Sequence, residues 1–404
     1  MNLKAFAKIG HWPTLVASFL YFDVSFMVWV MLGPLAVHIA RDLHLSPADK
    51  GLMVATPVLA GALLRVVMGV LVDHIGPRRA GILGQMTVMG ALAWAWLGGL
   101  HNLSQVYVMG FFLGVAGASF AVALPLASRW YPPEHQGLAL GIAGAGNSGT
   151  VFAALLAPTL ANRFGWQAVF GLALIPLAIA FVAYLFLAKE PPNRPAKQRL
   201  QNYFTVLRDR DAWWFMFFYA VTFGGFVGLS SSLVIYFNDQ YGLSPVVAGF
   251  FTAACVFAGS MVRPFGGLLA DRIGGVRTLT FVYLAAGLCL ALVSFAPSSQ
   301  WLAIAFFIAG MMALGTGNGA VFQLVPVRFR REIGVMTGLV GMAGGVGGFF
   351  LATSLGWSKQ WSGSYQTGFI SFALLAVVAV VGLARVKRRW RTTWGASDMT
   401  TARV

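Results

Sequence analysis

The chain has 404 residues, of which 58% are hydrophobic and only 10% are charged. Soluble domains carry roughly 25% charged residues, so this composition excludes an ordinary soluble protein and indicates an integral membrane protein. The formal net charge is +16, but the basic residues stand mostly in short turns between apolar runs, as the positive-inside rule describes. We therefore expect a lipid bilayer around the chain and no nucleic-acid partner.

Metal, redox and enzyme chemistry find no support in the sequence. The two cysteines, Cys255 and Cys289, stand in separate apolar runs without metal-ligand spacing. No cluster of histidine, cysteine and acidic residues occurs at a catalytic spacing. We expect a protein without a cofactor, a metal ion or an enzymatic activity.

Twelve apolar stretches are long enough to cross a bilayer, which takes about 20 helical residues. They cover approximately residues 12–40, 50–72, 80–99, 104–130, 137–161, 166–188, 212–238, 246–270, 278–297, 301–328, 333–356 and 365–385. The one long connection is rich in proline and charge, as a solvated linker should be. We predict an all-α membrane protein with two six-helix bundles, over 1–188 and 212–404, joined by a cytoplasmic linker over 189–211 and ending in a short basic tail.

The distribution of basic residues predicts the orientation of the chain. On the face opposite the N-terminus, the predicted turns contain only Arg41, Lys50, Arg163 and Lys359. The other turns share a face with the linker and the tail, so we expect both termini in the cytoplasm. The first apolar run is too long for the apolar region of a signal peptide, so we expect an uncleaved first span. We expect a monomer in the inner, cytoplasmic membrane of the cell.

A segment that begins at Arg65 recurs in the second half of the chain. Arginine, glycine, aspartate, isoleucine and glycine return at one constant separation, which between the arginines is 198 residues (263 − 65). A repeat of nearly half the chain predicts two homologous halves. In the polar turns that end the two copies, the residues that we expect to act in conformational gating are Asp73, Arg79, Asp271 and Arg277.

The repeated arginines, Arg65 and Arg263, lie within apolar runs. Each stands eight residues before the aspartate that opens a polar turn (73 − 65 and 271 − 263), which is about 12 Å along a helix, whereas half of the hydrocarbon core is about 15 Å. A central arginine costs roughly 2.5–3.5 kcal/mol and keeps its charge. Asp23 is the one acid that we place well inside a span, and one acid cannot neutralise two arginines. We therefore favour an anion site over the structural alternative, in which carboxylates or helix carbonyls compensate each charge.

Spans five and eleven are rich in glycine. Span five contains Gly144, Gly146 and Asn147, and span eleven contains Gly344 and Gly345. Glycine costs about 1 kcal/mol in a helix interior, so this density indicates close packing between helices or backbone that a small ligand can approach. An amide near the middle of a membrane needs partners, so we interpret Asn147 as an anion ligand or as a contact between helices, and favour the ligand.

Three aromatic residues in mid-span are further candidates. Phe120 in span four and Phe322 in span ten stand beside small residues, although a phenylalanine in a membrane span usually faces lipid or packs in the core. Tyr219 in span seven carries a hydroxyl group that must form a hydrogen bond within the bilayer. Its chemistry alone leaves its role open.

The run from Gly69 to Arg79 resembles the loop signature between spans two and three of the major facilitator superfamily, and the run over 267–277 resembles the corresponding loop of the second half. His74 stands where the signature usually has an arginine, whereas Arg272 keeps it. Within the superfamily, the two mid-span arginines and the two glycine-rich spans are similar to the nitrate/nitrite porter family. The resemblance extends over essentially all twelve spans.

This resemblance implies a transporter that moves nitrate, nitrite or both by alternating access. It implies a substrate site formed by Arg65, Arg263, Asn147, Tyr219, Phe120 and Phe322, together with the glycine motifs at Gly144, Gly146, Gly344 and Gly345. In span eleven a glycine stands where the internal repeat would place an asparagine, so this motif offers mainly backbone. Guanidinium groups suit a planar monovalent anion, and phenyl rings above and below would select flat ions over sulfate or phosphate.

The coupling ion is a separate question. An arginine cannot release a proton, so a proton-coupled cycle needs another group, and Asp23 near the middle of span one is the candidate. The alternative is an aspartate that stays ionised and either balances one arginine or caps a helix contact. We favour nitrate/proton symport through Asp23, with nitrate/nitrite exchange as the alternative and transport of another small anion less favoured. A nitrate sensor would need an appended signalling domain, which we do not expect in the short linker or tail.

Overall fold

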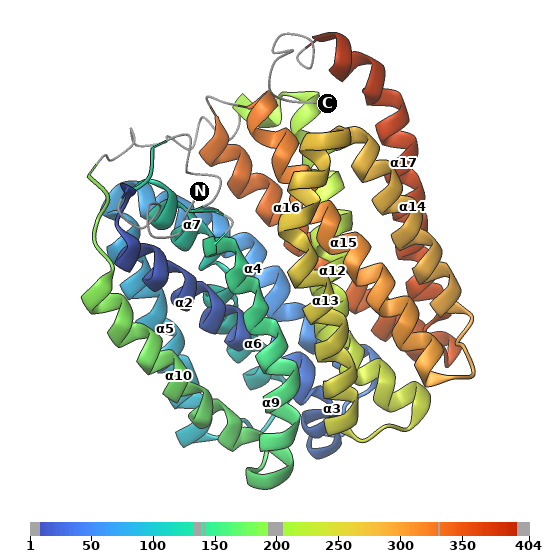
Figure 1. The fold of residues 1–404 in the computed structure, drawn as a ribbon. Helices are drawn as coiled ribbons and strands as arrows, with labels where there is room; N and C mark the ends of the chain where they lie inside the picture. The colour runs from blue at the N-terminus through green and yellow to red at the C-terminus, as the bar shows by residue number, and fades with distance from the viewer. Residues whose placement is uncertain (1–8, 133–138, 141, 193–204, 330–331, 394–404) are drawn as a thin grey trace.

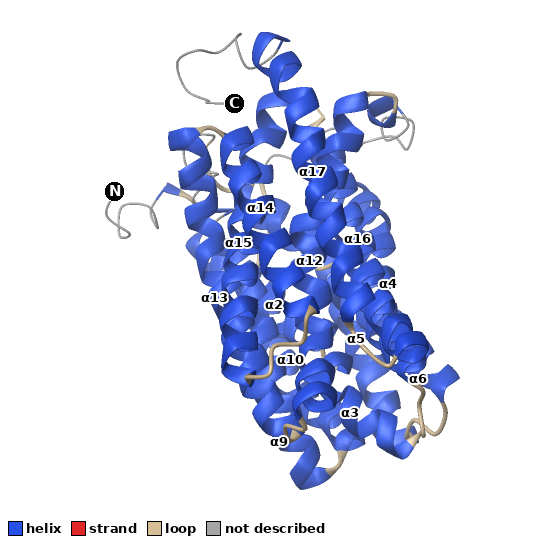
Figure 2. Cartoon of the chain, turned by 90° about the vertical axis from the view of Figure 1, so that its right-hand side faces the viewer, coloured by secondary structure: helices blue, strands red, loops and turns tan. Residues whose placement is uncertain are grey.

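The computed structural model describes residues 9–132, 139–140, 142–192, 205–329 and 332–393, and these residues form helices without a strand (Figure 2). The first nine elements are α2 Trp12–Trp29, α3 Leu32–Asp42, α4 Pro47–Ile75, α5 Pro77–Gly98, α6 Leu103–Gly117, α7 Phe120–Ser128, the 3₁₀ helix η1 Ala145–Ser148, α9 Gly149–Phe164 and α10 Trp166–Leu187. The remaining six are α12 Arg210–Tyr241, α13 Pro245–Ile273, α14 Gly275–Ser294, α15 Gln300–Arg328, α16 Ile333–Ser362 and α17 Gln366–Thr393.

Eleven helices of the described residues are long and apolar enough to cross a membrane. Two of these spans contain a break: α2 and α3 together form the first, and α6 and α7 together form the fourth. The predicted fifth span corresponds to η1 and the 16-residue α9, and residues 137, 138 and 141 of this span lie outside the described residues. The prediction of an all-α membrane protein is confirmed, and the predicted twelve spans are consistent with these elements.

The internal repeat of the sequence is also a repeat of the structure. Helix α4 begins at Pro47 and ends at Ile75, and α13 has both bounds shifted by 198 residues (245 − 47 and 273 − 75). The turns that follow contain Gly76 with φ 92° and Gly274 with φ 98°. Residues with a side chain rarely adopt this conformation, so glycine is required at the same point of both copies.

The helices of the first and last parts of the chain gather on different sides of the molecule. Figure 1 shows α2, α5 and α10 on one side and α14, α15 and α17 on the other. Between them, α4 packs against α16, α3 against α12, and α9 against α13. The division into bundles at residues 188 and 212 stays a prediction, and residues 193–204 of the proposed linker lie outside the described residues.

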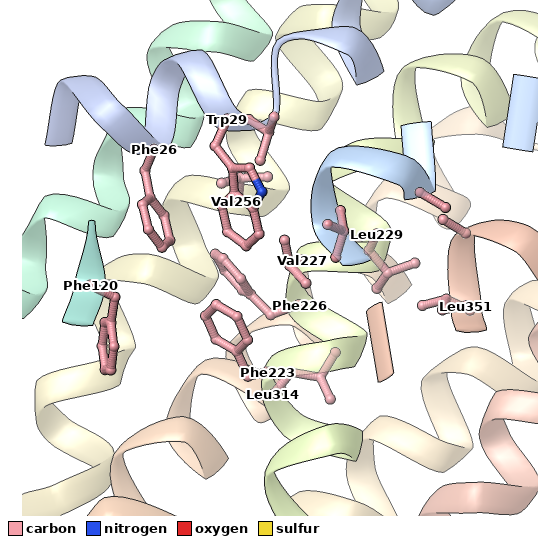
Figure 3. Close-up of a cluster of buried hydrophobic side chains, with 14 of the residues drawn as sticks. Phe26, Trp29, Phe120, Phe223, Phe226, Val227, Leu229, Val256, Leu314 and Leu351 are labelled. Carbon is pink, nitrogen blue, oxygen red and sulfur yellow. The ribbon is translucent and has the colours of Figure 1, made fainter. Parts of the chain in front are cut away.

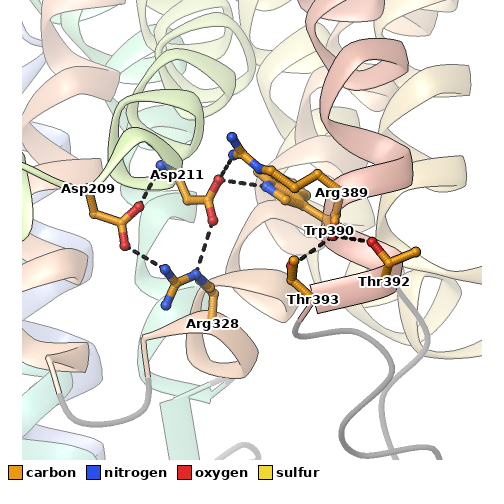
Figure 4. Close-up of polar contacts among 7 residues, drawn as sticks. All are labelled: Asp209, Asp211, Arg328, Arg389, Trp390, Thr392 and Thr393. Atoms are coloured by element: carbon orange, nitrogen blue, oxygen red, sulfur yellow. Dashed lines mark hydrogen bonds and ion pairs between the residues drawn. The ribbon is translucent and has the colours of Figure 1, made fainter.

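The last helix is longer than the sequence predicts. Helix α17 continues to Thr393, eight residues beyond the predicted end at residue 385 (393 − 385). Asp211 near the start of α12 is mostly buried and accepts hydrogen bonds from the Trp390 indole at 2.7 Å and from Arg389 (Figure 4). Arg328, at the end of α15, donates to the same carboxylate at 3.0 Å. These contacts hold the basic end of α17 as a helix against the bundle.

Candidate substrate site

Arg65 is held inside the bundle by backbone carbonyls of two other helices. The residue lies on α4 and is only 2% exposed. Its Nε donates to the carbonyl oxygen of Gly117 at the end of α6 (3.2 Å), and its Nη1 donates to that of Gly341 on α16 (2.6 Å). Its Nη2 is buried and has no hydrogen-bond partner among the described residues. Arg65 therefore keeps one donor free for a further acceptor.

Three aromatic rings surround the same guanidinium group. The Cζ atom of Arg65 lies 5.4 Å from the ring centre of Trp29, 5.3 Å from that of Phe120 and 5.1 Å from that of Phe223. Figure 3 shows these three rings within one buried cluster. Each contact has the geometry of a cation–π interaction. No carboxylate of the described residues forms an ion pair with Arg65, so aromatic rings and backbone carbonyls compensate its charge. The carbonyls, but not the carboxylates, agree with the structural alternative.

Arg263 is less firmly held than Arg65. It lies on α13 and is partly buried. Its Nη2 donates to the hydroxyl group of Tyr219 over 3.4 Å, and its Nη1 is buried without a hydrogen-bond partner in the described ranges. The structure thus brings the tyrosine and the second arginine together. Within the part of the chain that the structure describes, each arginine retains an unpaired N–H group.

The two phenylalanines meet between the halves of the molecule. The ring centres of Phe120 on α7 and Phe322 on α15 are 6.2 Å apart, and their planes are inclined by 52°. The ring of Phe322 also meets that of Tyr219 edge to face, with centres 4.9 Å apart. The rings do not form a parallel sandwich in this structure. They nevertheless connect the surroundings of Arg65 with those of Arg263.

Asn147 makes a contact between helices. It lies in η1 and is 2% exposed, and its Nδ2 donates to Ser260 on α13 over 3.4 Å. The amide oxygen has no hydrogen-bond partner in the described part of the chain. The internal repeat contains a counterpart of this contact. Gly345 and Ala62, which lie 198 positions from Asn147 and Ser260 (345 − 147 and 260 − 62), are also close together. The role of Asn147 as a ligand stays a prediction.

The candidate glycines differ in what they face. A Cβ atom at Gly146 would lie 2.7 Å from the Phe22 ring, one at Gly344 would lie 2.7 Å from the Tyr219 ring, and one at Gly345 would lie 2.5 Å from Ala62. These three glycines therefore permit close packing. A Cβ atom at Gly144 would have nothing within 4 Å, so this glycine alone faces open space.

Asp23 is fixed by residues near the start of α9. It lies on α2 and is 9% exposed, and its carboxylate accepts a hydrogen bond from Ser148 at 2.7 Å. The absence of a side chain at Gly149 allows the backbone of α9 to touch the carbonyl group of Asp23. In the described ranges Asp23 forms no ion pair with an arginine, and its bond with Ser148 is a contact between helices, which is the other form of the alternative. Its role as a proton site stays a prediction.

The gating candidates lie at equivalent points of the two copies: Asp73 and Asp271 in the last turns of α4 and α13, and Arg79 and Arg277 in the first turns of α5 and α14. Asp73 lies 3.8 Å from Arg129, and the backbone N–H of Arg79 donates to the carboxylate of Glu190 at 3.3 Å. Asp271 and Arg277 lie at corresponding positions of the second copy. Their part in conformational change stays a prediction.

Four residues around Arg65 were missed as site members by the sequence analysis: Trp29, Phe223, Gly117 and Gly341. The two glycines belong to glycine-rich segments, which could have identified them as points of close approach. The chain contains 13 tryptophans and 33 phenylalanines, so the sequence offers no signal for the two rings.

Comparisons with known proteins place the chain in a family. The sequence profile described as the Major Facilitator Superfamily matches residues 17–352. The chain is 37% identical over 366 residues to the "Probable nitrate/nitrite transporter NarK2" of Mycobacterium tuberculosis, covering 88% of this chain and 91% of that protein. It is 32% identical over 361 residues to the "Nitrite extrusion protein" of Bacillus subtilis, covering 88% and 90%. The chain belongs to the nitrate/nitrite porter family of the major facilitator superfamily.

A solved structure shares the fold of this nitrate/nitrite porter. A bacterial homolog of the human lysosomal transporter Spinster, in an inward-facing and occupied conformation, superimposes with a TM-score of 0.71 at 17% identity. The alignment covers 93% of this chain and 96% of that one. At this identity the likeness establishes the fold alone. The predictions of fold and family are confirmed, while the roles of the site residues in this porter stay predictions.

Proposed function

We propose that this protein is a secondary active transporter that moves nitrate, nitrite or both across the cytoplasmic membrane by alternating access, and that it is not an enzyme. Its substrate site is formed by Arg65 and Arg263 with Asn147, Tyr219 and the rings of Phe120 and Phe322. The names of the two relatives, a nitrate/nitrite transporter and a nitrite extrusion protein, support this substrate class.

The observation that carries the proposal is a pair of arginines that each have one buried Nη atom without a hydrogen-bond partner in the described ranges. Nη2 of Arg65 and Nη1 of Arg263 are both buried without a partner among the described residues. In the same ranges neither arginine has an ion pair. An oxyanion between the two guanidinium groups would accept from both donors and neutralise one of the two charges.

The rings give the site its selectivity. Phe120 contacts the guanidinium group of Arg65, and Phe322 contacts Tyr219, which accepts from Arg263. A flat monovalent ion can lie against ring faces and keep its oxygens in the plane of the arginine donors. A tetrahedral dianion would have to lose more hydration and would bring an oxygen against a ring face.

The coupling is nitrate/proton symport, with Asp23 as the proton site. Its carboxylate is nearly buried, bonded to Ser148 and free of an arginine partner in the described ranges. Nitrate/nitrite exchange is the alternative. The two arginines carry more positive charge than one monovalent anion neutralises, so the empty site should resist the change of conformation until an anion is bound. The protein acts as a monomer in the inner membrane with both termini in the cytoplasm, in keeping with its basic turns.

Uptake of nitrate by proteoliposomes tests this function and its coupling. Vesicles that contain the full chain should accumulate nitrate against its gradient when an inward proton gradient is imposed, without nitrite inside. Uptake that requires internal nitrite and ignores the proton gradient would establish exchange instead. Absence of nitrate and nitrite transport under both conditions would contradict the proposed function.

A further inference from the structure

Asn318 on α15 is a buried amide whose hydrogen bonds are unaccounted for. The residue is 1% exposed, and neither its Nδ2 nor its Oδ1 has a hydrogen-bond partner in the described part of the chain. Leaving one buried donor or acceptor unpaired is already costly. An amide with both ends free, in the interior of a transporter, therefore calls for a partner that arrives with the substrate.

The position of Asn318 on its helix places it next to the substrate site. One turn before it, Leu314 lies 2.9 Å from where a Cβ atom at Gly225 on α12 would stand. One turn after it, the ring of Phe322 meets the ring of Tyr219, also on α12. Residues four apart share a face of a helix, so Asn318 faces α12 between these two contacts.

Asn318 is also level with Arg263. The next residue, Gly319, packs so closely on α13 that a Cβ atom there would collide with the carbonyl oxygen of Arg263. The Nη1 of Arg263 is another buried donor without a partner in the described ranges. An amide oxygen can accept from this guanidinium group. The amide nitrogen then still needs an acceptor, which a bound oxyanion would supply.

The internal repeat does not identify this residue, because its counterpart in the first half is not an amide. Asn318 is shifted by 198 positions from Phe120 (318 − 120), so one half places a ring where the other places an amide. Asn147 has Gly345 as its counterpart (345 − 147), so the second half has no side chain where the first half has this amide. Each half thus has a buried asparagine at a position where the other half has a different residue type.

We propose that Asn318 is a further substrate-binding residue, whose Nδ2 donates to an oxygen of the bound nitrate or nitrite. Its Oδ1 accepts from one of the two N–H groups of Nη1 of Arg263, and the other N–H group is left for the anion. This inference rests on the proposed arginine site. Nitrate and nitrite carry acceptor oxygens and no donor at neutral pH, so the amide nitrogen is the end that meets the anion. The contact fixes the anion in the plane of the guanidinium group of Arg263.

The test compares Asn318→Leu and Asn318→Asp with a matched control. Leucine keeps the approximate size and removes both polar atoms, and aspartate replaces the donor by an anionic oxygen. Gln85→Leu on α5 is the control. Gln85 is likewise 1% exposed, and its amide oxygen has no partner among the described residues, but it lies beside Tyr21 and Val88. Initial rates of nitrate uptake give KM and kcat, and the Tm of the purified protein with and without nitrate gives binding.

We expect KM for nitrate to rise by about tenfold or more in both Asn318 variants, with kcat much less affected, since the lost contact binds the substrate in its ground state. The rise in Tm caused by nitrate should shrink in parallel. In Gln85→Leu both quantities should match the wild type. Should Asn318→Leu fail to fold, Asn318→Ser, which retains a donor, should bind nitrate more tightly than Asn318→Ala.

Two outcomes would overturn the assignment. One is a KM within about twofold of the wild type and an unchanged nitrate-dependent Tm in both Asn318 variants, which would make the amide a packing residue. The other is equal nitrate binding by Asn318→Ser and Asn318→Ala. Arg263→Lys distinguishes a failure of the Asn318 assignment from a failure of the arginine site. If this variant loses nitrate binding while the Asn318 variants do not, only the assignment of Asn318 is wrong. If none of these variants changes KM, the arginine site is wrong as well.

Discussion

Lys50 and Asp239 form an ion pair that joins α4 to α12 at the end of the bundle where α4 begins. The Lys50 Nζ and Asp239 Oδ2 atoms are 2.7 Å apart, and the side chains are 14% and 19% exposed. Tyr365, just before α17, donates its hydroxyl group to the same oxygen at 2.8 Å. The other ion pairs among the described residues join helices within the first six spans or within the last six. They are Asp73–Arg129, Asp209–Arg328, Asp211–Arg328 and Asp211–Arg389.

This pair is expected to stabilise the closed state of that end of the transporter. An exposed ion pair contributes about 0–1 kcal/mol, and removing one partner of a fully buried pair costs about 3–5 kcal/mol. The burial of Lys50 and Asp239 lies between these limits. We therefore expect about 1–3 kcal/mol, which shifts the equilibrium between the closed and open states of this end by roughly 5–150-fold.

Charge reversal tests this expectation. Lys50→Asp and Asp239→Lys should each open this end, and the double variant should restore closure because the pair is re-formed with reversed polarity. Spin labels at Arg41→Cys on α3 and Val247→Cys on α13, both exposed positions, report the opening as a longer distance in pulsed EPR, in a background free of native cysteines. Wild-type distances in both single variants, or no recovery in the double variant, would refute the reasoning.

Three further variants test the packing, the selectivity and the coupling. Gly347→Ala would drive a Cβ atom into the carbonyl oxygen of Ala220 and should lower the stability in detergent by about 1–3 kcal/mol or more, whereas Gly144→Ala meets nothing within 4 Å; equal Tm values for the two would contradict the packing of α12 on α16. Phe322→Ala should weaken nitrate uptake and let bulkier anions compete, and unchanged competition by sulfate and phosphate would make the ring a packing residue. Asp23→Asn should abolish proton-driven accumulation while nitrate exchange persists, and accumulation against a gradient in this variant would exclude Asp23 as the proton site.

Local pattern and the internal repeat were sufficient to predict most helices. The polar turns that begin at Asp73 and Asp271 mark the ends of α4 and α13, because glycine and charge interrupt an apolar helix at a membrane surface. The extension of α17 was missed because it depends on Asp211, which meets Trp390 from a distant part of the sequence. In a sequence, charged residues near the end of an apolar span indicate the end of the helix. In the structure, the contact with Asp211 keeps α17 helical as far as Thr393.

The site could be predicted as a set of residues but not as an arrangement. A charged residue in an apolar run is visible in any sequence, so Arg65 and Arg263 could be found without the structure. The surroundings of Arg65 could not, because Phe223 comes from α12 and Gly341 from α16, which are distant from Arg65 in the sequence. Asn318 stands among glycines and carries no charge, so only its burial without hydrogen bonds identifies it.

The two-arginine site is tested most directly by nitrate uptake of Arg65→Lys and Arg263→Lys in proteoliposomes, at equal amounts of folded protein in the membrane. Lysine keeps the positive charge but lacks the planar, two-pronged donor that matches an oxyanion. Each substitution is therefore expected to remove nearly all nitrate transport and the stabilisation of the purified protein by nitrate. Near-normal nitrate uptake by either variant would contradict a site in which both guanidinium groups hold the anion.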